Sequence, residues 1–175
     1  GVIAGNKVVG YENIANLYDE AIKIPFIIRA PALIEPGQEI EIPVSNIDVF
    51  PSIMSALAIK APNDLNLSGI DLIQISNEQD TLESRPIFAQ YAMRNFGYSD
   101  LRMVRSGKWK LIKRFNLKAN AELVDELYDL EADPNEETNL IKQVSNQPIY
   151  EKLDNLIHSW MISIDDPLLS SSYKQ

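Results

Sequence analysis

The stretch RMVRSGKWKLIKRF at residues 102–115, followed by ELYDLEADPNEETNL at residues 126–140, decides the fold of this chain. The Ser-Gly pair at 106–107 separates two strand-like runs and is typical of a tight β-hairpin turn. Two more such runs lie nearby, and together they predict a meander of about four antiparallel strands. The four runs are FAQYAMR (88–94), LRMVR (101–105), KWKLIKRF (108–115) and ELYDL (126–130).

An amphipathic helix is predicted after these strands. Pro148 suits its first turn, because the N–H that proline lacks would have no partner inside the helix at that position. The apolar residues that follow recur at helical spacing and should pack on the sheet. They are Ile149, Leu153, Leu156, Ile157, Trp160 and Met161.

The N-terminal half is predicted to form a helix, a strand and a second helix. Apolar residues from Tyr11 to Ala21 follow the helical rule, and Pro25 ends that helix. The continuously apolar run at 25–31 predicts a strand covered on both faces. The second helix is expected to begin after Asp48 as its N-cap and to carry an inward apolar stripe. The members of that stripe are Phe50, Met54, Leu57 and Ala58.

The amino-acid composition excludes several kinds of catalytic and metal site. The chain has 175 residues, with 16 basic and 25 acidic side chains, no cysteine and one histidine. A thiol nucleophile, a disulfide and a cysteine-ligated metal site are therefore excluded, and the single His158 excludes a zinc site with two or three histidines. The net charge of −9 argues against a general nucleic-acid binder. No apolar run approaches the ~20 residues that a membrane-spanning helix needs, so membrane insertion is not expected.

Charge is segregated along the predicted strands. Residues 84–121 hold nine bases and one acid, whereas residues 122–137 hold eight acids and no base, so neighbouring strands would pair favourably across a sheet. One alternative is that these bases and the aromatic residues among them form a stacking platform for nucleic acid. Alternation opposes it, because Trp109 points to the face opposite Lys108 and Lys110, as in a half-buried strand with a wet side.

Three further features are candidate sites. His158 lies one residue off the apolar stripe of its helix, and no G-x-S-x-G elbow supplies a nucleophile for it, so a structural or surface role is predicted. Segment 129–140 spaces its oxygens as a calcium loop does, but Pro134 occupies the slot that needs glycine, which favours a solvated turn. Lys7, in a glycine-flanked apolar loop, is either an exposed loop lysine or a point charge for an anionic group.

Three stretches taken together resemble one family. LYDEAIKIPFIIRAP (17–31) with SNIDVFPSIMSALAI (45–59) is similar to the sulfatase pattern in which a "YEE…RVPLIVR-P" helix and strand lead to a "DLFPTLL-LAGI" helix. The two stretches that open this section resemble the family's "R-VR-GDWKLI" hairpin and its "ELYDLENDPGE-NNL" turn. The chain thus resembles the C-terminal third of a sulfatase, of the alkaline-phosphatase-like α/β class, over nearly its whole length.

The resemblance implies a division into two parts. Residues 1–75 would be the C-terminal end of the catalytic α/β domain, and residues 85–175 a small α+β subdomain of antiparallel sheet plus helix. It also places the catalytic groups upstream: a formylglycine made from Cys or Ser in a C-x-P-x-R motif, and the ligands of a calcium ion. We therefore expect no catalytic or metal-binding residue here, an inactive isolated chain, and calcium only in the full-length parent.

The resemblance also marks residues near the N-terminus. Gly1 falls at the glycine of the family's metal-binding "DHG" motif, and Lys7 falls where many members have the histidine of "G-[DE]-H". Members usually carry a sulfate-contacting lysine where this chain has Ile14. Either Lys7 replaces that contact or the contact is absent, so Lys7 is the one substrate-binding candidate.

The function that the resemblance implies is sulfuric ester hydrolysis by the parent enzyme, on a sulfated carbohydrate or an aryl sulfate. The expected partners are that substrate and the missing N-terminal catalytic portion, without nucleic acid or membrane insertion. Export is common in the family, which favours a periplasmic or extracellular location. Two alternatives stay open: a phosphonate or phosphate ester hydrolase of the same superfamily, and a non-catalytic binding module derived from a sulfatase.

Overall fold

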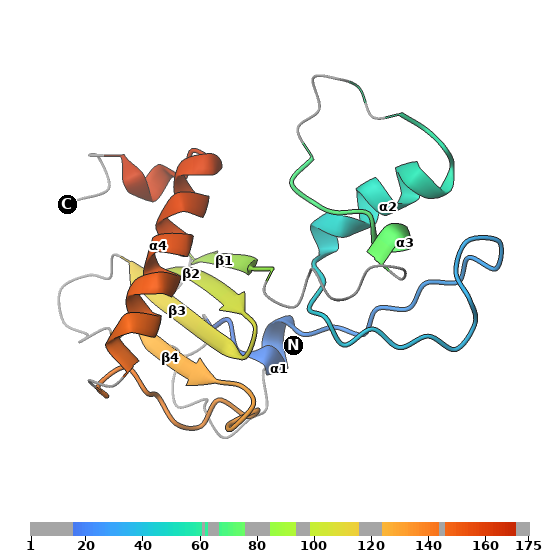
Figure 1. Ribbon diagram of the computed structural model, residues 1–175. Coiled ribbons are helices and arrows are strands. Elements are labelled where there is room, and N and C mark those ends of the chain that lie inside the picture. The colour runs from blue at the N-terminus through green and yellow to red at the C-terminus, as the bar shows by residue number, and fades with distance from the viewer. Residues whose placement is uncertain are drawn as a thin grey trace. The chain divides into compact units, whose positions relative to one another are not determined.

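The computed structural model describes residues 16–60, 62, 67–75, 85–93, 99–115, 124–143 and 146–170. The chain divides into two compact units (Figure 1). The first unit joins the chain up to Ile24 with Phe88–Gln175, and the second is Pro25–Ile87. The sheet predicted from the sequence lies in the first unit.

Four strands form a sheet in the order β1-β2-β3-β4, which confirms the predicted meander. Strands β2 and β3 run antiparallel with Met103 opposite Ile112, and β3 and β4 run antiparallel with Leu111 opposite Leu127. The turn between β2 and β3 uses Gly107, whose φ of 56° lies in the left-handed region that glycine tolerates. The strands are β1 (Ile87–Met93), β2 (Ser99–Ser106), β3 (Trp109–Phe115) and β4 (Glu126–Asp129).

Helix α4 (Gln147–Ser163) covers one face of this sheet, as predicted (Figure 1). Pro148 lies in its first turn. Phe88 of β1 stacks on Trp160 of the helix, with ring centroids 4.9 Å apart. The buried residues of the helix and of three strands form one apolar cluster. The cluster consists of Val104, Leu111, Leu127, Leu153, Ile157 and Met161.

The chain after α4 is tied back to the same face of the sheet. Arg102 of β2 donates to the Asp166 carboxylate from Nε at 2.5 Å and from Nη2 at 2.9 Å, and both side chains are buried. Asp166 also accepts the N–H of Leu168 in the short 3-10 helix η5 (Pro167–Leu169). Burial alone would raise the pKa of Asp166, but the hydrogen bonds from Arg102 and Leu168 hold it below its usual value.

The opposite face of the sheet is covered by the segment that leads into helix α1 (Asp19–Ile22). Leu17 packs there against buried residues of the strands, including Met103 and Tyr128. The predicted wet side of β3 is therefore wrong, since Lys110 on this face has no exposed surface. Of the helix predicted from Tyr11 to Pro25, residues 16–24 are described and only α1, Asp19–Ile22, is helical, so the predicted helix is too long; residues 11–15 lie outside the described residues.

The second unit holds η2 (Asn46–Asp48), α2 (Val49–Ala56) and α3 (Leu72–Ile75). Asp48, fully buried, receives two hydrogen bonds from Arg85 at 2.7 and 2.9 Å. Its carboxylate also accepts the backbone N–H groups of Ser45 and Ile70. Gly69 lies so close to η2 that an added Cβ would meet the Ile47 carbonyl oxygen at 2.1 Å.

Two predictions for the second unit are wrong. Residues 25–31 form no strand, and Ile27 keeps 91% of its surface exposed. A strand needs a neighbouring strand for its N–H and C=O groups, and no described strand pairs with this segment; the Ala30 carbonyl instead accepts the N–H groups of Leu33 and Ile34 in a turn. The predicted inward stripe is also largely exposed: Phe50 is 49% and Leu57 63% exposed, and only Met54 is half-buried. The helix instead turns Ser52 inward, where its hydroxyl accepts the N–H of Leu72.

The grouping of residues 16–24 with the sheet differs from the predicted first part, residues 1–75. Contacts of Leu17, Tyr18 and Asp19 with the strands account for this difference. For the parent enzyme, the division at 75–85 stays a prediction.

Candidate functional site

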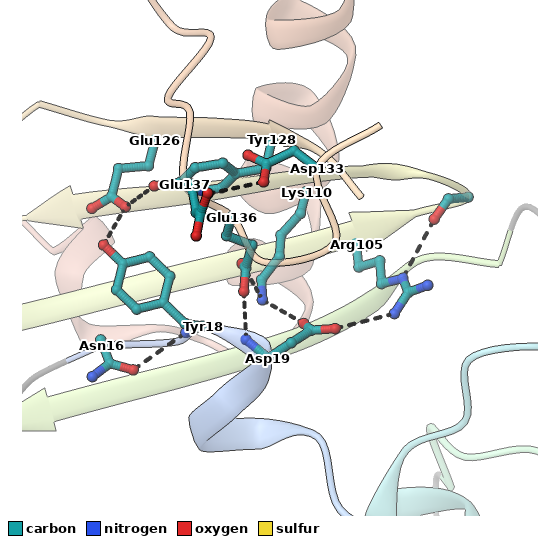
Figure 2. A network of polar contacts seen from close by, with 11 residues as sticks. Asn16, Tyr18, Asp19, Arg105, Lys110, Glu126, Tyr128, Asp133, Glu136 and Glu137 are labelled. Carbon is teal, nitrogen blue, oxygen red and sulfur yellow. Dashed lines mark hydrogen bonds and ion pairs between the residues drawn. The ribbon is translucent and has the colours of Figure 1, made fainter. Parts of the chain in front are cut away.

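A polar network joins the N-terminal segment to the sheet on the face opposite α4 (Figure 2). Its members come from four places along the chain: the start of α1, the β2–β3 hairpin, β4, and the turn after β4. We call it the Lys110 network. It consists of Asn16, Tyr18, Asp19, Arg105, Lys110, Arg114, Glu126, Tyr128 and Glu136.

Lys110 lies at the centre of this network. Its Nζ is 2.7 Å from Asp19 Oδ1 and 2.7 Å from Glu136 Oε1. Arg105 Nη1 approaches the second oxygen of Asp19 at 3.7 Å. Two carboxylates therefore lie against two cations, so the buried ammonium of Lys110 has counter-charges within contact distance.

Glu136 fixes the first residue of α1. Its Oε2 accepts the backbone N–H of Asp19 at 2.7 Å, one of the N–H groups that a helix start leaves without a partner inside the helix. Glu136 is buried and has a φ of 54°, which is uncommon for a residue with a side chain. Such a conformation persists where surrounding contacts determine it, and here Lys110 and Asp19 supply them.

Tyr18 provides a second anchor beside Asp19. Its hydroxyl and that of Tyr128 both donate to Glu126 Oε2 at 2.6 Å, and the two rings meet edge to face. Burial and the Glu126 carboxylate raise the pKa of Tyr18 to about 12, and the same causes raise the pKa of Tyr128. Burial alone would raise the pKa of Glu126, but Arg114 and the two hydroxyls hold it below its usual value.

The segment that resembles a calcium loop is a turn, as predicted, but its acids are not all solvated as expected, since Asp129 and Glu136 are buried. Asp129 accepts the N–H groups of Glu131 and Ala132 and pairs with Lys108 at 2.8 Å. Asp133 accepts the N–H groups of Glu137 and Thr138 (Figure 2). Throughout the described part of the chain, no group of three or more His, Asp or Glu residues is placed to hold a metal ion. The described residues therefore do not fit a calcium site.

The basic residues of the hairpin are committed to ion pairs, in agreement with the predicted pairing of oppositely charged segments. Lys108 contacts Asp129, Arg114 contacts Glu126, and Lys113 contacts Asp154 of α4. A nucleic-acid platform would need these cations on an open surface. The pairing with carboxylates counts against that alternative.

The sequence also marked individual residues, namely His158, Lys7, Gly1 and Ile14. His158 is exposed on α4, as expected for a surface residue. Lys7, Gly1 and Ile14 lie outside the described residues, so the role of Lys7 stays a prediction. No helix among the described segments is long and apolar enough to cross a membrane.

Sequence reasoning missed Lys110, Asp19 and Glu136 as a group. The charge blocks indicated that β3 would pair with the acids after it, and Lys110–Glu136 is such a pair. Asp19 gave no signal, because it lies 91 residues before Lys110 and only the folded chain brings the two together. Alternation was misleading as well, since it put Lys110 on a solvated face.

The chain matches a known protein family. The family model described as "N-sulphoglucosamine sulphohydrolase, C-terminal" matches residues 10–162, which includes all the residues of the Lys110 network. The chain belongs to the sulfatase family. It corresponds to the C-terminal portion of a sulfatase.

Relatives from distant organisms support this assignment. An uncharacterized sulfatase, YidJ of Escherichia coli, is 30% identical over 89% of this chain and 29% of its own length. An ulvan-active sulfatase of Formosa agariphila is 28% identical over 86% of the chain and 35% of its own length. Arylsulfatase K of Xenopus laevis is 28% identical over 90% of the chain and 28% of its own length. The chain thus spans about a third of these sulfatases.

Solved structures share the fold. A protein solved in complex with its substrate D-glucosamine-2-N,6-O-disulfate superposes with a TM-score of 0.67 at 20% identity, over 81% of this chain and 28% of that chain. The putative sulfatase yidJ of Bacteroides fragilis superposes with a TM-score of 0.60 at 16% identity, over 78% of this chain and 29% of that chain. At these identities the likeness shows the fold alone.

The three stretches that resemble sulfatase motifs meet in the Lys110 network. Tyr18 and Asp19 belong to the "YDE" stretch, Lys110 to "WKLI", and Glu126 and Tyr128 to "ELYDL". Each contacts a member of another stretch: Tyr18 bonds to Glu126 and meets the Tyr128 ring edge to face, and Asp19 pairs with Lys110. The "YDE", "WKLI" and "ELYDL" residues of the sheet unit therefore form one physical cluster, whereas the sulfatase-like residues 25–31 and 45–59 lie in the second unit.

Proposed function

We propose that this chain is the C-terminal part of a sulfuric ester hydrolase that acts on a sulfated carbohydrate or an aryl sulfate. The family match across residues 10–162 is the observation that carries the proposal. Relatives named for activity on ulvan and a structural neighbour bound to a glucosamine disulfate favour a sulfated glycan. The nucleophile and the calcium ligands would come from the portion of the enzyme before this chain.

The part of this chain nearest to the chemistry would be the loop that contains Lys7. A lysine ammonium is a point charge suited to a sulfate oxygen, and Ile14 stands where sulfatases usually have that lysine. We therefore propose Lys7 as a substrate-binding residue. Among the described residues, the basic side chains of β2, β3 and their turn serve ion pairs, and no described residue of the sheet unit is proposed as catalytic.

Exposed apolar side chains in the second unit support a partner portion that precedes this chain. Residues 26–28 and one face of α2 expose phenylalanine, isoleucine and leucine side chains that an isolated soluble domain usually buries. In the parent enzyme we propose that the catalytic portion covers them. They are Phe26, Ile27, Ile28, Phe50, Ile53 and Leu57.

The decisive test uses the full-length protein. The reading frame upstream of the Gly1 codon should encode Asp-His and, further upstream, a C/S-x-P/A-x-R motif. The full-length protein should then hydrolyse a sulfated monosaccharide or an aryl sulfate with a higher kcat/KM than the matching phosphate ester. A preference for the phosphate ester would move the assignment to the phosphate or phosphonate hydrolases.

The isolated chain provides the control. It should show no sulfatase turnover with calcium present, because the nucleophile lies outside it. Turnover by the isolated chain would contradict the proposal. A frame that opens just before Gly1, together with a cooperative melt and no binding of an apolar dye, would favour the non-catalytic module instead.

A further inference from the structure

We propose that residues 25–31 are a strand of a sheet that lies in the portion of the enzyme before this chain, and that they join this sheet by main-chain hydrogen bonds. Helix α2 would place its apolar face on the same portion. This inference rests on the proposed function, which supplies a preceding portion, and deepens it by naming how the two portions join. The partner is thus a sheet edge with apolar surface beside it.

The main chain of residues 24–29 is open to pairing. The backbone has no helix, turn or bend from residue 23 to residue 30 (Figure 1). Among the described residues, main-chain hydrogen bonds stop at Lys23 and resume at Ala30. Unpaired N–H and C=O groups on such a segment are a template for pairing with another strand.

The side chains of this segment need cover on two sides. Phe26, Ile27 and Ile28 are consecutive, and all three are exposed. Consecutive residues of a strand point to opposite faces, so a single covering layer would bury only part of them. Strands that are apolar at nearly every position are typical of sheets with helices on both faces. A place at the edge of such a sheet therefore suits this segment better than a flat apolar patch does.

Helix α2 is oriented for the same kind of partner. Its Ser52 is buried, and the Ser52 hydroxyl donates to the Asp48 carbonyl at 2.6 Å and accepts the Leu72 N–H at 2.8 Å. A helix on the surface of an isolated domain buries its apolar stripe and exposes its polar side, whereas α2 does the reverse. An apolar helix face and an unpaired strand are the two elements that an α/β layer buries together. The exposed residues on that face are Phe50, Ile53 and Leu57.

The length of the relatives favours a preceding portion as the occupant. The chain covers between 28% and 35% of the three relatives described above, so most of each relative lies outside the matched region. The family model matches residues 10–162, which include both the segment 25–31 and α2. A second copy of this chain would bring its net charge of −9 against the same charge, and an anionic bilayer would repel it too.

Hydrogen exchange of the wild-type protein is the first test. Peptides covering residues 24–31 should exchange on the order of 100-fold more slowly in the full-length enzyme than in this chain alone, because pairing protects their N–H groups. Peptides from α4 are the internal reference and should be protected in both. Equally fast exchange of residues 24–31 in the two proteins would overturn the inference, and this test needs no variant to fold.

Substitutions at Ile27 are the second test. Ile27→Glu would bury a charge and Ile27→Pro would remove a paired N–H, so each should lower the thermal midpoint of the full-length enzyme by about 5 °C or more. In this chain alone both should leave the midpoint within about 1 °C, since the Ile27 side chain is 91% exposed. Unchanged midpoints of both variants in the full-length enzyme would overturn the inference.

Two control variants accompany them. Ile27→Val keeps an apolar, β-branched side chain and should lower the midpoint of the full-length enzyme by no more than about 2 °C. Ile162→Glu changes an apolar residue of α4 that is 57% exposed, and it should leave the midpoint of both proteins within about 1 °C. A loss with Ile162→Glu as large as that with Ile27→Glu would overturn the assignment of the contact to residues 25–31.

Two more measurements separate this inference from its alternatives. If residues 24–31 of this chain alone become protected as its concentration rises, and it sediments as a dimer, the occupant is a second copy and the inference is overturned. Hydrolysis of a sulfate ester by a full-length enzyme whose residues 24–31 stay unprotected would overturn the inference alone. Protected residues in a full-length protein that hydrolyses no sulfate ester would overturn the proposed function and support the joining of the two portions.

Discussion

Replacing Asp166 by asparagine should destabilise the sheet unit by about 3 kcal/mol, because Arg102 would remain buried without a counter-charge. Removing one partner of a buried pair costs about 3–5 kcal/mol. Arg102 and Asp166 are both nearly inaccessible and share two hydrogen bonds of 2.5 and 2.9 Å. Asparagine keeps one oxygen acceptor for either Arg102 or Leu168, which puts the expected loss at the lower end of that range.

The assay is urea unfolding followed by tryptophan fluorescence. The only two tryptophans, Trp109 on β3 and Trp160 on α4, both lie in the sheet unit, so the signal reports on that unit. Asp154→Asn is the matched control, because the pair of Asp154 with Lys113 also joins α4 to the sheet but is partly exposed. Exposed pairs contribute about 0–1 kcal/mol, and the control should lose no more than that.

The stability difference between wild type and Asp166→Asn should depend on pH. The folded-state pKa of Asp166 lies below the unfolded value of about 3.9, so its pair contributes fully above that value and is lost as the pH falls through the folded pKa. The difference between wild type and Asp166→Asn should therefore be constant at neutral pH and shrink below pH ~4. A loss under about 1 kcal/mol, or a difference unchanged down to pH 3, would refute the reasoning.

Three further predictions concern other parts of the chain. Asp48→Asn should destabilise the second unit by about 2–3 kcal/mol, since it leaves the Arg85 guanidinium without its counter-charge. Urea unfolding followed by circular dichroism measures this loss, and a change in unfolding free energy under about 0.5 kcal/mol would count against the prediction. Ile27→Glu should lower binding of an apolar dye by the isolated chain while leaving its midpoint in urea within error, because Ile27 is 91% exposed; a large drop in midpoint would show that the side chain is covered. Tyr18→Phe should lower the unfolding free energy by about 1 kcal/mol, because it removes the hydrogen bond to Glu126. In an ultraviolet titration it should also remove one phenol that ionises near pH 12, and loss of a phenol that titrates near pH 10 would contradict the raised pKa.

The sheet unit could be predicted from the sequence because its information is local. The Ser106-Gly107 turn sets the hairpin, alternation sets the faces of β3, and Pro148 with the 3.6-residue spacing sets α4. The second unit could not be predicted as well, because the run at 25–31 and the stripe of α2 carry apolar patterns whose covering partners are absent from the described residues. The apolar pattern predicted a burial that these side chains do not have in the described part of this chain.

The Lys110 network was harder to predict from the sequence than the sheet. A lysine at an alternating position of a strand predicts a solvated face, and that inference fails only when carboxylates from elsewhere meet it. One carboxylate, Glu136, was near enough in sequence to be implied by the charge blocks. The other, Asp19, was recognisable only as one letter of a "YEE"-like motif whose physical reason was unknown.

The structure gives a physical reason for Asp19 in this motif, namely its contact with Lys110, and the motifs can be interpreted together. The "YDE", "WKLI" and "ELYDL" stretches look like separate signatures in the sequence, yet Tyr18–Glu126 and Asp19–Lys110 join them in pairs. A substitution in one stretch should therefore have its effect through another. Because Lys110 is fully buried and the Asp19 side chain that it pairs with is only 20% exposed, loss of either partner deprives the other of this counter-charge, and double substitutions such as Asp19→Asn with Lys110→Met should cost less than the sum of the single ones. Additive losses would show that the stretches act independently and that the network does not couple them.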